Sequence, residues 1–195
     1  MKRIVLTLML LLATGLFAQN ATIEEIDKSP VETQFAAGGH IRMDLCPSST
    51  HIVGADEKRV RVSYESKRGD EDVKVRIQVT GDRADVRVGR CPHNNFEMTI
   101  EVPKSSNLYV RMFAGEMGIR GVSGNKDVQL HAGELTIDVG DPAMYAHVDA
   151  SVVTGDLEAP PFDVSKGGLF RSFERSGSGN YRLHAHVGAG QVQLQ

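Results

Sequence analysis

Ala132-Gly133-Glu134-Leu135-Thr136-Ile137 is the stretch that decides the fold, because its pattern returns along the chain. The pattern is a small residue, glycine, a polar residue and then alternating apolar positions. Further copies begin at Ala114, Thr154 and Ala189, and an imperfect early copy spans residues 37–43. Copies spaced roughly 20 residues apart are typical of stacked coils. We therefore expect an all-β, single-domain stack of short strands, β-solenoid-like or β-helix-like, with glycines at its corners.

The spacing of the glycines supports corner positions. Gly115, Gly124 and Gly133 are nine residues apart, and short apolar-x-apolar runs separate them. Two such intervals make one coil of about 18 residues, a plausible length for one turn of a solenoid. Glycine suits a corner because it adopts positive φ without a Cβ clash.

Strand patterns dominate the rest of the chain. Apolar and polar residues alternate over 60–64, 73–79, 86–88 and 98–102. Alternation with a period of two predicts strands with one buried and one solvated face. Helix evidence is weak and limited to residues 21–28, where a short helical turn is expected.

The first 18 residues have the features of a secretory signal peptide. Lys2 and Arg3 precede an apolar run, and small residues follow up to Ala18. We expect cleavage after Ala18, a lead segment over 19–34 and one domain over 35–195. No later stretch is apolar and long enough to span a membrane, so the mature chain is expected in the periplasm or outside the cell.

Charge and composition exclude some partners. The chain has a net charge of −3 and no basic block, which argues against nucleic acid as a partner. Tryptophan is absent and aromatic residues make up only 6%, so a stacking platform for sugars or bases is not expected.

The chain has two cysteines, Cys46 and Cys91, and each is followed by proline. In an exported chain an even pair is most simply one disulfide. The alternative is a reactive or metal-binding thiol pair, but no CxxC pattern or basic cluster accompanies either residue. We predict a structural disulfide.

Three stretches resemble the bacterial "putative adhesin" domain of unknown function, a family related to head-GIN-type domains: residues 96–103, residues 108–110 with the Ala-Gly-Glu copies that follow, and residues 187–194 at the C-terminus. The resemblance covers 35–195. It implies a β-solenoid fold and an adhesive role, and it carries over no catalytic residues.

Two groups of residues have the chemistry of metal ligands. His184 and His186 lie on one face of a predicted strand, with Asp149 and His147 on the preceding coil. Glu134 and Asp156 follow corner glycines, as does Glu116, and stacked coils would align them into a column that suits calcium. In each case the simpler interpretation is an outward, solvated position, and we expect no metal and no other cofactor.

No catalytic motif is present in the sequence: it lacks GxSxG, HExxH, a phosphate-binding loop and a dinucleotide fingerprint. Residues 166–175 are locally amphipathic and are interpreted as a cap over the open end or the side of the stack, or alternatively as a docking loop. Tyr109 and Phe113 are the candidate binding anchors, unless the cap buries Phe113.

We therefore expect an exported, non-enzymatic interaction module. Its partner is an unidentified envelope or surface protein or a glycan. The alternative is a small cell-envelope enzyme, or a metal-dependent glycan-binding protein, built on the same scaffold.

Overall fold

The structure, a computed structural model, describes residues 20–65, 72–92 and 96–195. The predicted signal peptide lies outside the described residues. Within them the chain is all-β, as predicted, with 13 strands and two short 3-10 helices. Among these residues no helix combines the length and the apolar character needed to cross a membrane.

The first eight strands are short: β1 (Asn20–Ile26), β2 (Val31–Gln34), β3 (His40–Leu45), β4 (Ser48–Ala55), β5 (Arg59–Glu65), β6 (Lys74–Thr80), β7 (Arg83–Gly89) and β8 (Glu97–Pro103). The later strands are longer: β9 (Asn107–Arg120), β10 (Lys126–Ile137), β11 (Tyr145–Ala159), β12 (Val164–Ser176) and β13 (Tyr181–Leu194). The helices η1 (Pro142–Met144) and η2 (Pro160–Phe162) flank β11.

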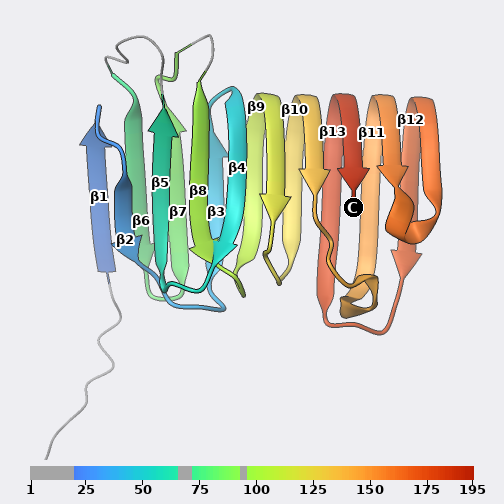
Figure 1. The fold of residues 1–195 in the computed structure, drawn as a ribbon, viewed down its shortest axis with the longest axis horizontal. Helices are drawn as coiled ribbons and strands as arrows, with labels where there is room; N and C mark the ends of the chain where they lie inside the picture. Colours follow the sequence, from blue (N-terminus) through green and yellow to red (C-terminus); the bar gives the residue numbers. More distant parts are fainter. Residues whose placement is uncertain (1–19, 66–71, 93–95) are drawn as a thin grey trace, which may run out of the picture.

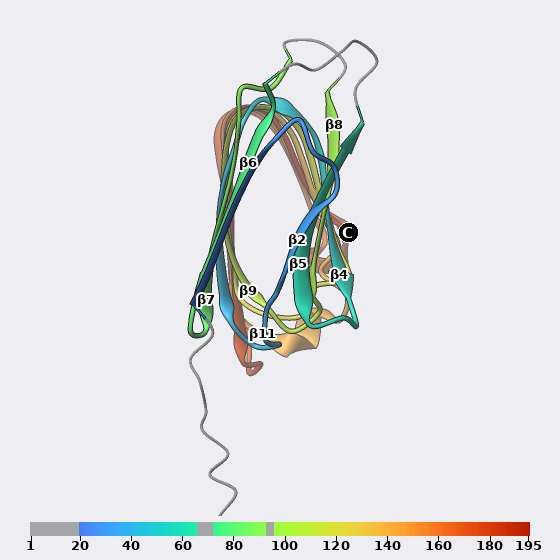
Figure 2. The same cartoon turned by 90° about the vertical axis from the view of Figure 1, so that its left-hand side faces the viewer.

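All the strands belong to one sheet that is folded into two facing layers (Figures 1 and 2). One layer follows the order β1-β6-β7-β3-β9-β10-β13-β11-β12, and β2, β5, β8 and β4 pair on the opposite layer. Figure 2 looks along the stack and shows the long strands passing from one layer to the other at the upper edge. Each long strand therefore contributes to both layers.

The bend of the long strands is made by glycine. β9, β10, β13 and β11 are parallel and in register, so Gly115, Gly133, Gly190 and Gly155 form one row. Their φ angles lie between 126° and 135°, a region that residues with a Cβ rarely adopt. A Cβ at Gly133 would also lie 1.9 Å from the carbonyl oxygen of Gly115. The positive φ predicted for Gly133 is confirmed.

The order of the strands in space differs from their order in the chain. β13, the last strand, lies between β10 and β11. Ala189 is the register partner of both Ala132 and Thr154. A plain succession of coils would instead have placed β11 directly beside β10.

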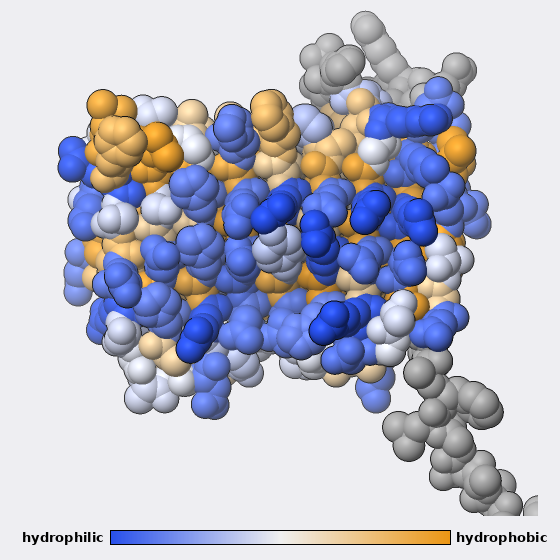
Figure 3. Space-filling view, turned by 180° about the vertical axis from the view of Figure 1, so that it is seen from behind, coloured by the Kyte–Doolittle hydropathy of each residue, from blue (hydrophilic) through white to orange (hydrophobic). Residues whose placement is uncertain are grey.

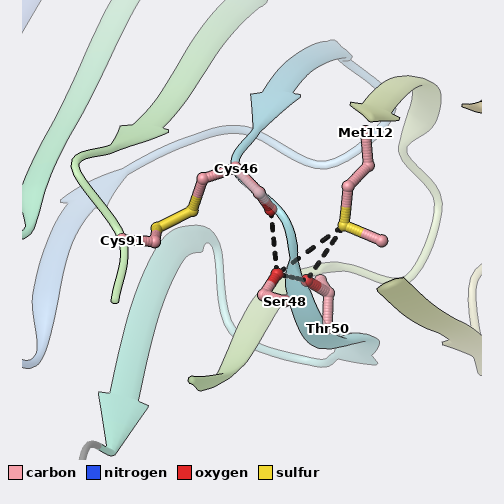
Figure 4. Close-up of a disulfide and its surroundings, with 5 residues drawn as sticks. All are labelled: Cys46, Ser48, Thr50, Cys91 and Met112. Atoms are coloured by element: carbon pink, nitrogen blue, oxygen red, sulfur yellow. Dashed lines mark hydrogen bonds between the residues drawn. A yellow bond between two sulfur atoms is a disulfide. The ribbon is translucent and has the colours of Figure 1, made fainter. Parts of the chain in front are cut away.

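The first half of the chain makes the same bend with separate strands. β3 pairs in parallel with β9, and β4 resumes the pairing on the other layer at Ser48↔Gly115. Cys46 lies in this bend and is bonded to Cys91, with their Cα atoms 6.1 Å apart. Figure 4 shows that the Ser48 hydroxyl donates to the Cys46 carbonyl oxygen, at 3.0 Å. The predicted disulfide is confirmed.

The core lies between the two layers, as the alternation predicts. Inward residues such as Ile100, Val110 and Leu135 are fully buried. The helical turn expected over 21–28 is wrong, because this segment is strand β1, which pairs with β6 from Asn20 to Ile26. β2 likewise pairs with β5, so the predicted lead segment contributes two strands to the sheet.

The interpreted cap, residues 166–175, lies within β12, which forms the edge of the sheet at one end (Figure 1). Most of β12 is exposed, and Phe173 packs against the core. The alternative in which this segment buries Phe113 is wrong, because 66% of Phe113 is exposed.

Candidate functional site

The outer surface of the layer that contains β3, β9, β10, β13 and β11 carries two rows of mainly polar side chains. We call it the polar face, and Figure 3 shows polar residues gathered over it. The row nearer the bend consists of the register partners Arg87, Asp44, Arg111, Gln129, His186 and Ser151. The next row consists of Asp85, Arg42, Tyr109, Asp127, His184 and Asp149.

The two predicted histidines lie side by side on this face but bond to different partners. His184 Nδ1 is 3.0 Å from Asp149 Oδ2, and His186 Nδ1 is 2.9 Å from the Ser151 hydroxyl. Both contacts join β13 to β11, so the expectation that Asp149 lies beside His184 is confirmed. Ala185, which lies between the two histidines in the chain, is buried.

This arrangement separates the parts of a catalytic triad. In a triad the same histidine bonds the nucleophile through one nitrogen and an orienting carboxylate through the other. Here the carboxylate of Asp149 bonds His184, whereas the Ser151 hydroxyl bonds His186. The geometry therefore gives a hydrogen-bonded polar surface rather than an activated serine.

Tyr109 lies at the centre of the second row between two cations. The guanidinium carbons of Arg42 and Arg111 are 5.3 Å and 4.8 Å from the centre of its ring. Contacts of this length are favourable cation–π interactions, and they hold both arginines close to the sheet. Tyr109 is half-buried as a result.

A shallow groove of about 680 Å³ runs along the polar face beside the disulfide. Asp44, Arg111, Gln129 and His186 line it, as does Cys46. On its bend side Phe113 stacks on His131, with ring centres 4.9 Å apart and planes 16° apart. The groove thus offers a cation, a carboxylate and an amide beside an exposed aromatic pair.

The four candidate metal ligands do not come together. His184 and His186 precede the bend of β13, whereas Glu134 and Asp156 follow the bends of β10 and β11 and lie on the other layer. In that row Gln191 pairs with both Glu134 and Asp156 and so separates them. Across the described ranges, no group of three or more His, Cys, Asp or Glu side chains is arranged to hold a metal ion.

Sequence reasoning missed one buried charge. Lys126 is only 2% exposed, and its ammonium donates to the Tyr145 hydroxyl at 2.9 Å and to the Gly124 carbonyl oxygen at 3.4 Å. Burial lowers the pKa of Lys126 to about 8, against an opposing effect of Asp138. Burial also raises the pKa of Tyr145 to about 12. The available signal was the alternation Lys126-x-Val128-x-Leu130, which places the lysine on the inward side.

A solved bacterial protein has a similar fold. A putative cell adhesion protein from Clostridium sporogenes matches over 90% of this chain and 99% of its own, with a TM-score of 0.50 and 14% identity. A putative adhesin from Bacteroides fragilis matches over 93% of this chain and 100% of its own, with a TM-score of 0.36 and 8% identity. No family model and no curated protein matches the sequence. The resemblance predicted from the sequence is thus confirmed at the level of the fold.

Proposed function

We propose that this protein is an exported, non-enzymatic interaction module of the adhesin type, and that it binds its partner through the groove on the polar face. The observation that carries the proposal is Phe113, an exposed aromatic residue stacked on His131 at the rim of the groove. Large aromatic and arginine side chains are the usual anchors of binding surfaces. Arg111, on the same strand, supplies the second anchor.

The packing of the site supports a role in binding. Arg111 is held over Tyr109 and therefore loses little conformational freedom when a partner arrives. The disulfide and the sheet also fix the walls of the groove, because Cys46 and Leu45 belong to the same bend. A groove that is formed in advance suits an extended segment of a surface protein or a glycan chain.

Two features support export. A disulfide persists in oxidising compartments and is rare in the cytosol, and Cys46 and Cys91 are bonded. The predicted signal peptide at residues 1–18 agrees with this. The proposed destination is the periplasm or the cell exterior.

The finer description of the scaffold as a β-solenoid is also part of the proposal. The parallel, in-register strands β9, β10, β13 and β11 and their common row of glycines support it. The insertion of β13 between β10 and β11 means that such a solenoid would not wind in simple chain order.

Binding of the exported chain to an array of cell-surface polysaccharides and immobilised envelope proteins tests the function. We expect Arg111→Ser combined with Phe113→Ser to weaken binding at least about tenfold, equal to about 1.4 kcal/mol. Arg120→Ser is the matched control, since Arg120 is also an exposed arginine of β9 but follows the bend onto the other layer. Equal loss in the control, or unchanged binding in the double variant, would contradict the proposed site.

The metal-dependent alternative has a separate test. Purified protein is analysed for zinc and calcium by mass spectrometry, alongside His184→Ala. We expect neither metal at stoichiometric level. A stoichiometric metal that disappears in His184→Ala would favour the alternative and would assign the pair His184–Asp149 to a metal site.

A further inference from the structure

The two ends of the sheet are both uncovered strand edges within the described residues. β12 pairs only with β11 at one end, while β1 pairs with β6 and β2 with β5 at the other. Figure 1 shows these edges at opposite ends of the long axis. An uncovered edge offers unpaired backbone groups that can pair with another strand.

The strand directions at the two ends are complementary on both layers. Following the pairings across the sheet, β1 and the first half of β11 run in the same direction, whereas β12 is antiparallel to β11. β2 likewise runs with the second half of β11 on the other layer. A second copy stacked end to end would therefore pair antiparallel with β12 through β1 and β2 at once.

The inward side chains of β12 are unusual for a strand that ends a core. Lys166, Arg171 and Arg175 are register partners of the buried residues Leu157, Val152 and Val148. Inward charges protect an edge, because pairing with an apolar strand would leave them buried and unpaired. Lys166 already donates to the Ser172 carbonyl oxygen and Arg175 lies over the Phe162 ring. Arg171 therefore excludes most strands and favours a partner with an acid at its own level.

The opposite end of the same molecule supplies that acid. Glu25 of β1 lies at the same level of the sheet as Arg171 of β12. Successive register partners connect the two residues across the sheet: Val75, Val88, Leu45, Met112, Leu130, Val187 and Val152. In the same way Ile23 is level with Phe173. β1 and β2 together carry three glutamates and no basic residue, while β12 carries three basic residues and one glutamate.

The bend adds an apolar contact to this match. Phe170 is 79% exposed and has a φ of 52°, a rare conformation for a bulky residue, and Leu169 beside it is 61% exposed. The apolar colour at the upper left of Figure 3 marks this end of the molecule. Ile26, one residue nearer the bend than Glu25, is 50% exposed at the other end.

We infer that copies of this protein associate head to tail, with β12 of one copy docked on β1 and β2 of the next, Glu25 paired with Arg171 and Ile26 packed on Phe170. In the isolated chain Glu25 bonds Lys28 at 2.9 Å and Arg171 Nε donates to the Gly167 carbonyl oxygen at 2.7 Å. On docking, these two exposed contacts are replaced by the ion pair between Glu25 and Arg171. Because the two surfaces differ, the contact does not close into a dimer and extends into a row of molecules.

Sedimentation velocity of residues 19–195 tests the inference over about 1 μM to 1 mM, the range of transient interfaces. Any tag belongs at Gln195, because β13 lies away from both ends. Wild-type protein is expected to form species larger than dimers as concentration rises. Glu25→Lys and Arg171→Glu should each weaken association at least about tenfold. The double variant E25K/R171E should restore it, since each contact again joins opposite charges.

Glu116→Lys and Arg120→Glu are the controls, because they make the same charge changes on β9, far from both ends. They should assemble like wild type, and circular dichroism should show that every variant is folded. The inference is overturned if wild-type protein stays monomeric or stops at a dimer. It is also overturned if the single end variants assemble normally, or if the double variant fails to recover. None of these results bears on binding at the groove.

Discussion

Two halves of this molecule make the same bend by different means. In β9, β10, β13 and β11 the strand continues through the bend, and a glycine lies at its turning point. In the first half β3 and β4 are separate strands, and the chain between them holds Cys46. Two residues lie between Leu45 and Ser48, and two lie between Met112 and Gly115, so the bends are equal in length.

Ser48 shows why only one half needs glycine. It is the register partner of Gly115 and begins the row. Each glycine packs on the backbone of the previous residue in the row: a Cβ at Gly115 would meet the Ser48 carbonyl oxygen at 2.0 Å, and one at Gly155 would meet that of Gly190 at 1.7 Å. The glycine half depends on close backbone contact, and the first half uses a covalent bond instead.

The largest effect is expected from Gly133→Val. The new side chain would have to adopt a φ of 126° and overlap the carbonyl oxygen of Gly115. Strain and overpacking together should cost about 3 to 5 kcal/mol in the free energy of unfolding. Gly89→Ala is the control, because a Cβ there meets no atom within 4 Å. Chemical denaturation gives both values, and an equal effect at the two sites would refute the distinction between them.

Removing the disulfide should have the next largest effect. Cys46→Ser with Cys91→Ser opens a loop with a sequence separation of 45. We expect a loss of about 2 to 4 kcal/mol in unfolding free energy. The unmodified protein, denatured without reductant, should contain no titratable thiol. Two free thiols per chain would show that the first half does not use a covalent bond.

A smaller effect is expected from Lys126→Met, and it should depend on pH. The pKa of Lys126 is lowered to about 8 in the fold, so the unfolded chain binds its proton more tightly. The free energy of unfolding of the wild type, measured relative to that of the variant, should therefore rise by about 2 kcal/mol between pH 8 and pH 10. Above pH 10 the raised pKa of Tyr145 makes the stability of both proteins fall with rising pH, so it does not contribute to the difference between them. If the difference in unfolding free energy between wild type and variant did not change with pH, Lys126 would be solvated.

The smallest effect is expected from Phe113→Ser. The ring is mostly exposed and stacks on His131 at the surface. Unfolding free energy should change by less than about 0.5 kcal/mol. Thermal and denaturant melts measure this directly. A loss above 1 kcal/mol would make Phe113 a structural residue of the bend and would weaken its assignment as a binding anchor.

Much of the fold could be predicted from the sequence because its signals are local. Alternation identified the inward residues of β6 and β8, and positive φ at Gly133 followed from the pattern around it. The strand β1 was missed because it lies at an edge, where polar residues such as Glu24 and Glu25 occupy both faces. Edge strands lack the strong alternation of half-buried strands.

The position of β13 could not be predicted, because the copies resemble one another too closely. Ala189-Gly190 matches Ala132-Gly133 as well as it matches Ala114-Gly115, so spacing alone does not specify which copies are neighbours. The groove depends on the same long-range order. Arg111, Gln129 and His186 become adjacent only through the pairing of β9, β10 and β13.

Cross-linking of outward side chains tests this strand order most directly, since both the row of glycines and the groove depend on it. Adjacent strands are about 4.8 Å apart, within disulfide reach, whereas strands two places apart are about 10 Å apart and out of reach. We predict that Gln129→Cys with His186→Cys, and His186→Cys with Ser151→Cys, form disulfides that peptide mapping detects. Gln129→Cys with Ser151→Cys should form none. Efficient bonding of this last pair, with failure of Gln129→Cys with His186→Cys, would place β11 beside β10 and contradict the account.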